Sequence, residues 1–252
     1  MKVLLTGASS GIGRDMARYL SSLGHDLILV ARSKDKLSDL KKSLETNVTI
    51  IPLDLSVEKN VYKLYDMTKD ENIDILINNA GFGLFGLFTE TDLDTELKMI
   101  DLNVKAYHIL TKLFLCDFVK RGSGYILNTC SSAGFMAGPR LNTYYATKNY
   151  ITKLTMAINE ELRQTKSNVV ISALCPGPVS TEFNKVAHGA FSLKEASSEY
   201  VAKYAIDHLF KKKMIIIPKL SMKLGTFGLR FIPYRLQLII AYHIQWRKSG
   251  KK

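Results

Sequence analysis

The sequence contains few cysteines. Only three occur among its 252 residues, Cys116, Cys130 and Cys175, and none belongs to a CxxC pair. A set that is small, odd in number and widely spaced favours neither a disulfide framework nor a zinc site, and it suits a reducing cytoplasm best. The chain passes directly from Met1-Lys2 into an apolar run at 3–5, so we expect no secretory leader and a cytoplasmic location.

Long apolar runs are also missing. A membrane-spanning helix needs about 18 or more consecutive apolar residues, and no uninterrupted run in this sequence reaches that length. The most apolar candidate near the end of the chain, a helix expected from Leu236 to Trp246, is preceded by Arg230, Pro233 and Arg235. We therefore expect no transmembrane span.

Acidic residues are absent from the end of the chain, where none follows Asp207. Eleven of the 35 lysines and arginines lie within 211–252. The other 24 nearly balance the 23 acidic residues, so almost all of the net charge of +12 comes from residues 211–252. Apolar side chains alternate with these charges, and we therefore expect no nucleic-acid partner. Two interpretations of 218–252 stay open: peripheral contact with an anionic membrane, and packing over the substrate cleft or a dimer partner.

Short apolar runs alternate with segments of helical periodicity as far as about residue 217. The runs predict strands at 2–6, 26–31, 48–52, 73–78, 124–129, 169–174 and 214–217. The segments between them predict helices at 12–22, 34–46, 57–70, 92–120, 144–165 and 197–211. Because the strands are apolar throughout, rather than at alternate positions, they indicate a parallel sheet covered on both faces.

This alternation predicts an α/β fold with a doubly wound, mostly parallel seven-stranded sheet of the Rossmann-like type and helices on both faces. We expect residues 1–217 to form one dinucleotide-binding catalytic domain. Residues 218–252 would be a basic amphipathic extension of that same domain.

A glycine-rich segment follows the first predicted strand and opens the first predicted helix. Its spacing in Thr6–Gly13 is GxxxGxG rather than GxGxxG. Glycine lets a backbone turn sharply and approach a pyrophosphate, and a helix N-terminus favours negative charge. The segment could instead be only a tight connection, but its position at the first strand–helix junction favours dinucleotide binding. The residues expected to contact the cofactor here are Gly7, Ser9, Ser10, Gly11, Ile12 and Gly13.

The second predicted strand is followed by Arg32 rather than by an acidic residue. In this architecture an acidic side chain there binds the ribose 2′-hydroxyl of NAD, whereas an arginine accommodates the 2′-phosphate of NADP. We therefore expect NADP(H), with NAD(H) as the alternative. Further cofactor contacts are expected after the third and fourth strands, where ligands bind in open α/β sheets, at Asp54, Leu55, Asn78, Ala80 and Gly81.

Tyr144 and Lys148 are four residues apart and would share one helix face. The spacing alone is weak evidence, because Tyr65 and Lys69 repeat it in a charged helix. The first pair differs in its context, since Ser131 lies thirteen residues before Tyr144, just after a predicted strand. An unperturbed phenol with a pKa near 10 is a poor base at neutral pH, and a neighbouring ammonium would lower that pKa.

Taken together, the motifs resemble those of the short-chain dehydrogenase/reductase family. They are TGASSGIG at 6–13, NNAG at 78–81, Asn103 in Asp-Leu-Asn-Val, Ser131, the Tyr144–Lys148 pair and CPGPVST at 175–181. Their order and spacing agree with this family over residues 2 to about 217.

The resemblance implies a role for each residue. Tyr144 would be the general acid/base, and Ser131 would hydrogen-bond the substrate oxygen. Lys148 would hold the nicotinamide ribose and lower the pKa of Tyr144. Asn103, on a helix irregularity, would anchor a water that relays protons to Lys148. The residues implied at the nicotinamide end of the cofactor are Tyr144, Lys148, Pro176, Gly177, Val179 and Thr181.

Neighbouring residues fit these roles less well. Tyr145 has Asn149 rather than a cation four residues on, so we do not expect it to be the acid. Cys130 is expected to pack inward, because no histidine is close in sequence to activate it. His188 lies in a segment that caps the substrate in the family, and a contact from it is the less favoured interpretation.

We therefore predict an NADP(H)-dependent oxidoreductase that interconverts a carbonyl and a secondary alcohol, acting mainly as a reductase and without a metal. The substrate would be a hydrophobic ketone or a 3-oxoacyl or steroid-like compound. A homodimer or homotetramer would form through the helices near 103–120 and 144–165. The alternatives are a non-catalytic dinucleotide sensor and a membrane-associated scaffold.

Overall fold

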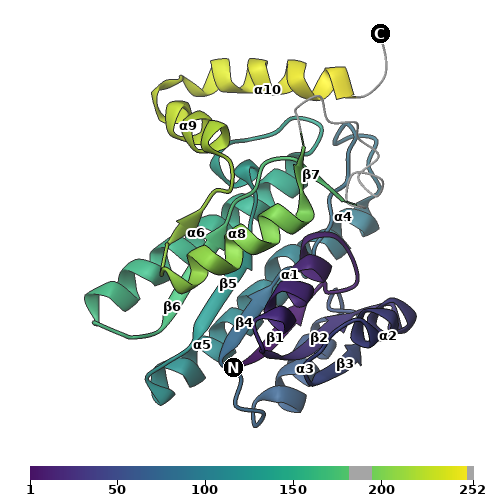
Figure 1. Cartoon of the computed structure of the whole chain (residues 1–252). Coiled ribbons are helices and arrows are strands. Elements are labelled where there is room, and N and C mark those ends of the chain that lie inside the picture. Colours follow the sequence, from purple (N-terminus) through teal and green to yellow (C-terminus); the bar gives the residue numbers. More distant parts are fainter. Residues whose placement is uncertain (182–194, 249–252) are drawn as a thin grey trace.

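The computed structural model describes residues 1–181 and 195–248, which fold around a parallel sheet with helices on both faces (Figure 1). Seven strands pair in the order β3-β2-β1-β4-β5-β6-β9, and every pairing is parallel. The strands are β1 Lys2–Thr6, β2 Asp26–Ala31, β3 Val48–Pro52, β4 Ile75–Asn78, β5 Tyr125–Thr129, β6 Val170–Leu174 and β9 Ile215–Ile216. The predicted seven-stranded, doubly wound fold is confirmed.

Two hydrophobic layers explain why the strands are apolar at every position. On β1, Val3 and Leu5 pack with helices α1 Gly11–Ser22 and α8 Ser198–Phe210. Leu4 faces the other way, into a layer with α3 Glu58–Thr68 and α5 Tyr107–Arg121. Successive side chains of a strand point to opposite faces, so a sheet covered on both sides needs an apolar residue at each position.

The strand order reverses next to β1, which pairs with β2 on one side and with β4 on the other. In open α/β sheets, ligands bind in the crevice beyond the carboxyl ends of the strands at such a reversal. The remaining helices are α2 Lys34–Lys42, α4 Leu93–Ile100, α6 Asn142–Gln164, α9 Leu220–Gly228 and α10 Tyr234–Lys248. Among the described residues, no helix is long and apolar enough to cross a membrane.

The helix predicted over 92–120 is interrupted. The chain forms α4, then a π-helical stretch η1 Asp101–Ala106, then α5. Inside η1 the Asn103 side chain is buried and bonded to the backbone of Phe82, a residue outside the helix. A contact of this kind is invisible to a periodicity argument, since it depends on tertiary packing.

Two further features were not predicted. A short parallel pair joins β7 Val179–Ser180 to β8 Ala196–Ser197. Helix α9 is the other, and it has no buried residue. Figure 1 shows α9 and α10 at one end of the sheet, with α10 running across the top of the view.

Candidate active site

The glycine-rich segment makes a tight turn between β1 and α1. Gly7 has a φ of +68° and Gly11 a φ of +52°, values that side chains rarely tolerate. A methyl group at Gly13 would overlap the carbonyl oxygen of Gly7. The turn therefore needs glycine at all three positions, and its backbone lies open to a ligand.

Asn79 holds this turn against the end of β4, a role that the sequence analysis missed. Its Nδ2 donates to the carbonyl oxygens of Thr6 at 3.2 Å and Gly7 at 3.1 Å. In return, the Thr6 hydroxyl accepts from the backbone N–H groups of Asn79 at 2.9 Å and Ala80 at 3.2 Å. The signal was present in the Asn-Asn pair at 78–79, of which only the first residue was selected.

The N-terminus of α1 opens onto a cleft of about 390 Å³. Ser10 is its extended N-cap residue, and its side chain makes no capping hydrogen bond within the described structure. The uncapped N–H groups and the helix dipole favour an anion. The residues that line the cleft are Ser9, Ser10, Gly11, Arg14, Lys36, Ser180, Thr181 and Ser198. Small hydroxyl side chains and two cations around a helix N-terminus fit the phosphates of a dinucleotide.

Arg14 and Lys36 at this cleft were also missed by the sequence analysis. Both lie in the first turns of the helices that follow β1 and β2, whereas the prediction considered only Arg32, directly after β2. Arg32 itself follows β2 and is exposed. The cationic character of the site thus comes from more than one helix.

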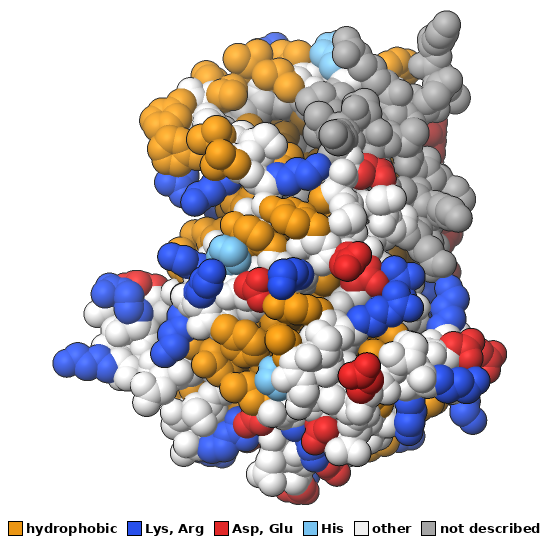
Figure 2. Space-filling model, viewed as in Figure 1, with side chains coloured by type: hydrophobic (Ala, Val, Ile, Leu, Met, Phe, Trp, Pro, Cys, Tyr) orange, Lys and Arg blue, Asp and Glu red, His pale blue; other side chains and the backbone are white. Residues whose placement is uncertain are grey.

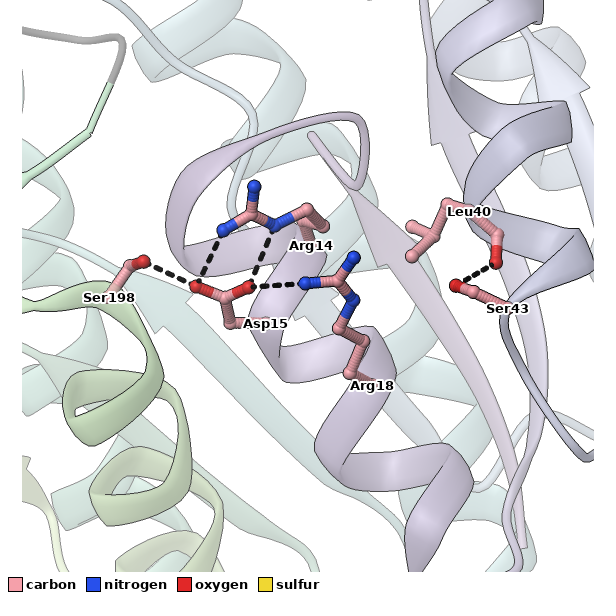
Figure 3. Close-up of polar contacts among 6 residues, drawn as sticks. All are labelled: Arg14, Asp15, Arg18, Leu40, Ser43 and Ser198. Atoms are coloured by element: carbon pink, nitrogen blue, oxygen red, sulfur yellow. Dashed lines mark hydrogen bonds and ion pairs between the residues drawn. The ribbon is translucent and has the colours of Figure 1, made fainter.

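A buried carboxylate orients Arg14 at the rim of the cleft (Figure 3). Asp15 accepts from Arg14 Nε at 2.8 Å and Nη2 at 3.1 Å, and Arg18 Nη1 lies 3.7 Å away. The Ser198 hydroxyl donates to the same carboxylate from α8. Burial alone would raise the pKa of Asp15, but the hydrogen bonds from Arg14 and Ser198 outweigh it and hold that pKa below its ordinary value. The charged carboxylate therefore joins α1 to α8 and fixes one guanidinium beside the cleft.

The side chains of two predicted cofactor residues pack within the fold. The Asn78 side chain is buried, and its Nδ2 donates to Thr111 Oγ1 at 3.1 Å and Asn128 Oδ1 at 2.9 Å. Leu55 is likewise buried, in the hydrophobic layer with α3 and α5. Asn78 thus bridges two strands and a helix, because a buried amide must find polar partners. Asp54 caps its own turn, accepting from the N–H of Ser56 at 2.9 Å.

Gly81 lies where two predicted catalytic side chains meet. A methyl group added there would lie 2.9 Å from Asn103 Oδ1 and 3.6 Å from Lys148 Nζ. Asn103 Nδ2 also donates to the Phe82 carbonyl at 2.9 Å and to Thr147 Oγ1 at 3.2 Å. Its position in η1 thus joins the turn after β4 to α6.

Ser131, Tyr144 and Lys148 come together beyond the end of β5. Ser131 directly follows Cys130 at the end of that strand, and the other two lie on α6. The side chains of Ser131 and Tyr144 are hydrogen-bonded to each other. Lys148 Nζ donates to the Thr129 carbonyl at 2.8 Å and lies 5.8 Å from the centre of the Tyr144 ring. The four residues predicted as catalytic are therefore linked by contacts: Asn103 and Lys148 lie beside Gly81, Lys148 lies near the Tyr144 ring, and Tyr144 is bonded to Ser131.

The pKa of Tyr144 is shifted in the direction opposite to the sequence-based expectation. Burial raises the pKa of Tyr144, and the hydrogen bond from Ser131 opposes that rise only in part. Burial also lowers the pKa of Lys148 to about 8. Lys148 was expected to lower the pKa of Tyr144, and in this structure the loss of solvation outweighs any such effect. The phenol is consequently protonated at neutral pH.

The residues around this group behave largely as expected. Cys130 packs inward and is buried. The hydroxyl of Tyr145 accepts a hydrogen bond from Gln245 Nε2 at 3.0 Å. The side-chain amide of Asn149 donates to backbone carbonyl oxygens. Tyr107, which the sequence analysis did not select, places its ring 5.2 Å from Lys148 Nζ.

The segment after β6 lies against the glycine turn through Thr181. A methyl group at Gly11 would lie 2.9 Å from Thr181 Cγ2, so Thr181 borders the start of α1. The carbonyl of Pro176 accepts from the N–H of Ser132 at 2.8 Å, which holds Gly177 near the end of β5. Val179 begins β7. His188 lies outside the described residues, within which no cluster of histidine, cysteine and acidic side chains could hold a metal ion.

Comparisons with known proteins agree with the fold. A family model described as short chain dehydrogenase matches residues 1–189. An uncharacterised oxidoreductase of Staphylococcus epidermidis is 32% identical over 180 residues, which covers 71% of this chain and 77% of that protein.

Two solved structures are similar over nearly the whole fold. A short-chain dehydrogenase from Sphingobium yanoikuyae in complex with NADPH has a TM-score of 0.81 and 28% identity, with 92% of this chain and 96% of that chain covered. A bulky-bulky ketone specific alcohol dehydrogenase from Comamonas testosteroni has a TM-score of 0.77 and 26% identity, with 92% and 94% covered.

Proposed function

The chain belongs to the short-chain dehydrogenase/reductase family of oxidoreductases, and we propose that it is an NADP(H)-dependent enzyme that reduces a carbonyl to a secondary alcohol. The observation that carries this proposal is the series of contacts that links Asn103, Lys148, Tyr144 and Ser131, with Asn103 and Lys148 beside Gly81. Residues 1–217 carry all the groups that the reaction needs, and residues 218–252 extend the same domain.

The chain's own residues orient the substrate and move the proton. A bound nicotinamide dinucleotide supplies the hydride. The Ser131 hydroxyl is hydrogen-bonded to Tyr144 in this structure, and on substrate binding it turns its single proton to the carbonyl oxygen, which then lies between the two hydroxyls. Tyr144 then donates its proton to that oxygen as negative charge develops on it. Lys148, fixed by the Thr129 carbonyl, provides a positive charge that stabilises the resulting phenolate, and Asn103 fixes the η1 backbone behind it.

The raised pKa of Tyr144 supports reduction as the main direction. A phenol that burial keeps protonated at neutral pH is ready to act as an acid toward a carbonyl. Oxidation of an alcohol would require the phenolate as a base, and burial disfavours that form.

Three cations support NADP(H) as the preferred cofactor. Arg14 and Lys36 line the cleft at the start of α1, and Arg32 follows β2, where the adenosine ribose lies in this architecture. The NADPH bound to the Sphingobium yanoikuyae relative supports the same choice.

The substrate we propose is a hydrophobic ketone or a 3-oxoacyl or steroid-like compound. The ketone-specific Comamonas testosteroni relative supports the ketone class. Phe82 directly follows Gly81 and Phe135 lies four residues after Ser131, and both are only partly buried. They provide apolar surface beside the proposed position of the carbonyl.

We further propose a cytoplasmic homodimer or homotetramer that pairs through α5 and α6. Val119 on α5 and Tyr150 on α6 are large apolar side chains exposed on these helices. Exposed apolar groups on adjacent helices suit an isologous interface.

The test is NADPH and NADH oxidation against a panel of carbonyl compounds, with Arg32→Ala beside the wild type. We expect turnover with NADPH, and we expect Arg32→Ala to lose about tenfold or more in kcat/KM for NADPH but not for NADH, as removal of a charge-assisted hydrogen bond predicts. NADPH binding without turnover of any carbonyl would support the sensor alternative and overturn the proposed reaction.

A further inference from the structure

Helix α10 buries two polar side chains. Gln237, Ala241 and Gln245, spaced four residues apart, are the buried residues among those whose side chains the structure describes. Leu238, Ile239 and their apolar neighbours are exposed. An ordinary surface helix buries its apolar stripe and exposes its polar one, whereas α10 buries two glutamines and leaves large apolar side chains exposed.

Hydrogen bonds from the buried glutamines fix this orientation. Gln237 Nε2 donates to the carbonyl oxygens of Leu229 at 2.8 Å and Ile232 at 2.7 Å. Gln245 Nε2 donates to the Tyr145 hydroxyl at 3.0 Å. Rotation of the helix to bury its leucines would break these three hydrogen bonds and transfer the amides to water. The apolar side is therefore held outward.

Helix α9 and the residues after it continue the same exposed surface. Leu220 is 71% exposed, Leu224 63% and Phe227 56%, and their spacing places them on one face of α9. Phe231, in the turn that follows, is 74% exposed. We call the whole set the C-terminal apolar surface, and its members are Leu220, Leu224, Phe227, Phe231, Tyr234, Leu236, Leu238, Ile239 and Ile240.

Figure 2 shows hydrophobic side chains gathered over α9 and α10 at the top of the view, with lysine and arginine side chains next to them. A monomeric protein rarely exposes a contiguous apolar patch larger than a few hundred Å², and larger patches mark interaction sites. A patch on two adjacent helices that is held outward by hydrogen bonds therefore implies an apolar partner.

The charges around the surface identify that partner. Lys223, Arg230 and Arg235 are exposed on the same segment, and no acidic residue follows Asp207 in the sequence. A second copy of the chain would bring these cations against their own equivalents, and such like-charge juxtaposition is unfavourable. An anionic lipid bilayer offers apolar depth and negative headgroups together.

We propose that the C-terminal apolar surface docks onto an anionic lipid bilayer, with α9 and α10 in the interface and the basic side chains among the headgroups. The docked segment lies next to the candidate catalytic residues. On α9, the Met222 Cγ would lie 2.9 Å from a methyl group added at Gly177. On α10, Gln245 donates a hydrogen bond to Tyr145, which is adjacent to Tyr144 in the chain. Docking would thus bring the substrate edge of the sheet to the lipid.

The experiment is co-sedimentation of the full chain with vesicles of phosphatidylcholine alone, or of phosphatidylcholine mixed with phosphatidylglycerol, at low and high salt. We expect binding to the mixed vesicles only, and weaker binding as salt screens the charges. Lys223→Gln, Arg230→Gln and Arg235→Gln together should weaken binding roughly 100-fold, as three basic side chains at a surface predict. Phe227→Ser with Phe231→Ser should weaken it by about 100-fold as well.

Matched controls remove the same groups from the body of the protein. Lys41→Gln, Lys59→Gln and Lys63→Gln remove three exposed lysines, and Leu93→Ser removes an exposed apolar side chain. These variants should bind as the wild type does.

Light scattering on the same samples separates the other occupants of the surface. Absence of binding to mixed vesicles at low salt would overturn the proposal. So would an oligomer that Phe227→Ser with Phe231→Ser dissociates, since the surface would then belong to a second copy. Vesicle binding does not depend on turnover, so its failure would leave the proposed reaction untouched.

Discussion

The chain contains two tyrosine–lysine pairs with identical spacing, Tyr144–Lys148 on α6 and Tyr65–Lys69 at the end of α3. Both tyrosines make a hydrogen bond, but their partners differ in charge. Tyr144 bonds the neutral hydroxyl of Ser131, whereas the Tyr65 hydroxyl donates to the Asp117 carboxylate at 2.7 Å. That bond, more than burial, raises the pKa of Tyr65 to about 12.

The two lysines differ in both burial and bonding partner. Lys148 is buried, and its amine is fixed on the Thr129 carbonyl beside the site. Lys69 is exposed and pairs with Asp66 at 3.2 Å, one turn earlier on the same helix. The first pair is thus a desolvated acid and cation at a strand end, and the second is an ordinary surface arrangement. Spacing sets which side chains share a face, and the surroundings decide what chemistry they can do.

Lysine replacement gives the largest contrast. Lys148→Met keeps the length of the side chain but removes the charge that would stabilise the Tyr144 phenolate, so we expect kcat/KM to fall by about 10³-fold. Lys69→Met should leave steady-state kinetics unchanged, because its amine contacts only Asp66 among the described residues. An equal loss in both variants would mean that the two pairs are not functionally different.

Ser131→Ala should have the next largest effect. Removal of one donor to the developing oxyanion lowers kcat by about 10²-fold in such sites. Ser132→Ala is the matched control, since its backbone N–H bonds the Pro176 carbonyl and would be retained. If Ser132→Ala lost more activity than Ser131→Ala, the assignment of the oxygen-binding hydroxyl would be wrong.

The buried lysine should also show in the pH dependence of stability. Burial lowers the pKa of Lys148 from 10.5 to about 8, so between these values the unfolded chain holds more protons at this residue and its contribution to the free energy of unfolding rises with pH. From pH 8 to pH 10, urea unfolding should show the wild type gaining about 2 kcal/mol relative to Lys148→Met. Lys69→Met should track the wild type, and a flat difference for Lys148→Met would contradict the burial of its amine.

The smallest effect concerns the second tyrosine. Tyr65→Phe removes a hydrogen bond to a carboxylate that is partly buried, and we expect a loss of about 1 kcal/mol in the free energy of unfolding with unchanged activity. Tyr62→Phe, on an exposed side chain of the same helix, should alter neither. Reduced activity in Tyr65→Phe would contradict the claim that only the Tyr144–Lys148 pair takes part in the reaction.

The strands were predictable from the sequence because a sheet covered on both faces imposes apolar residues at every position. Val3, Leu4 and Leu5 alternate between two hydrophobic layers, and a run of this kind is visible without any structure. The proximity of Ser131 to Tyr144 was expected as well, from the resemblance of the motifs to those of the short-chain dehydrogenase/reductase family.

Features that depend on long-range contacts were not predictable. The inward direction of Asn78 follows from Thr111 and Asn128, which lie 33 and 50 residues away. The raised pKa of Tyr144 follows from burial, and spacing predicted the opposite direction. The burial of Gln237 and Gln245 on α10 accompanies glutamine bonds to Tyr145 and to two backbone carbonyls, contacts that no periodicity reveals.

The measurement that tests the central claim most directly is carbonyl reduction by Tyr144→Phe beside Tyr65→Phe, with NADPH binding recorded for both. We predict that Tyr144→Phe loses about 10³-fold in kcat and still binds NADPH, because only the transferable proton has been removed. Tyr65→Phe should turn over as the wild type does. Equal turnover in Tyr144→Phe and the wild type would contradict the assignment of Tyr144 as the acid.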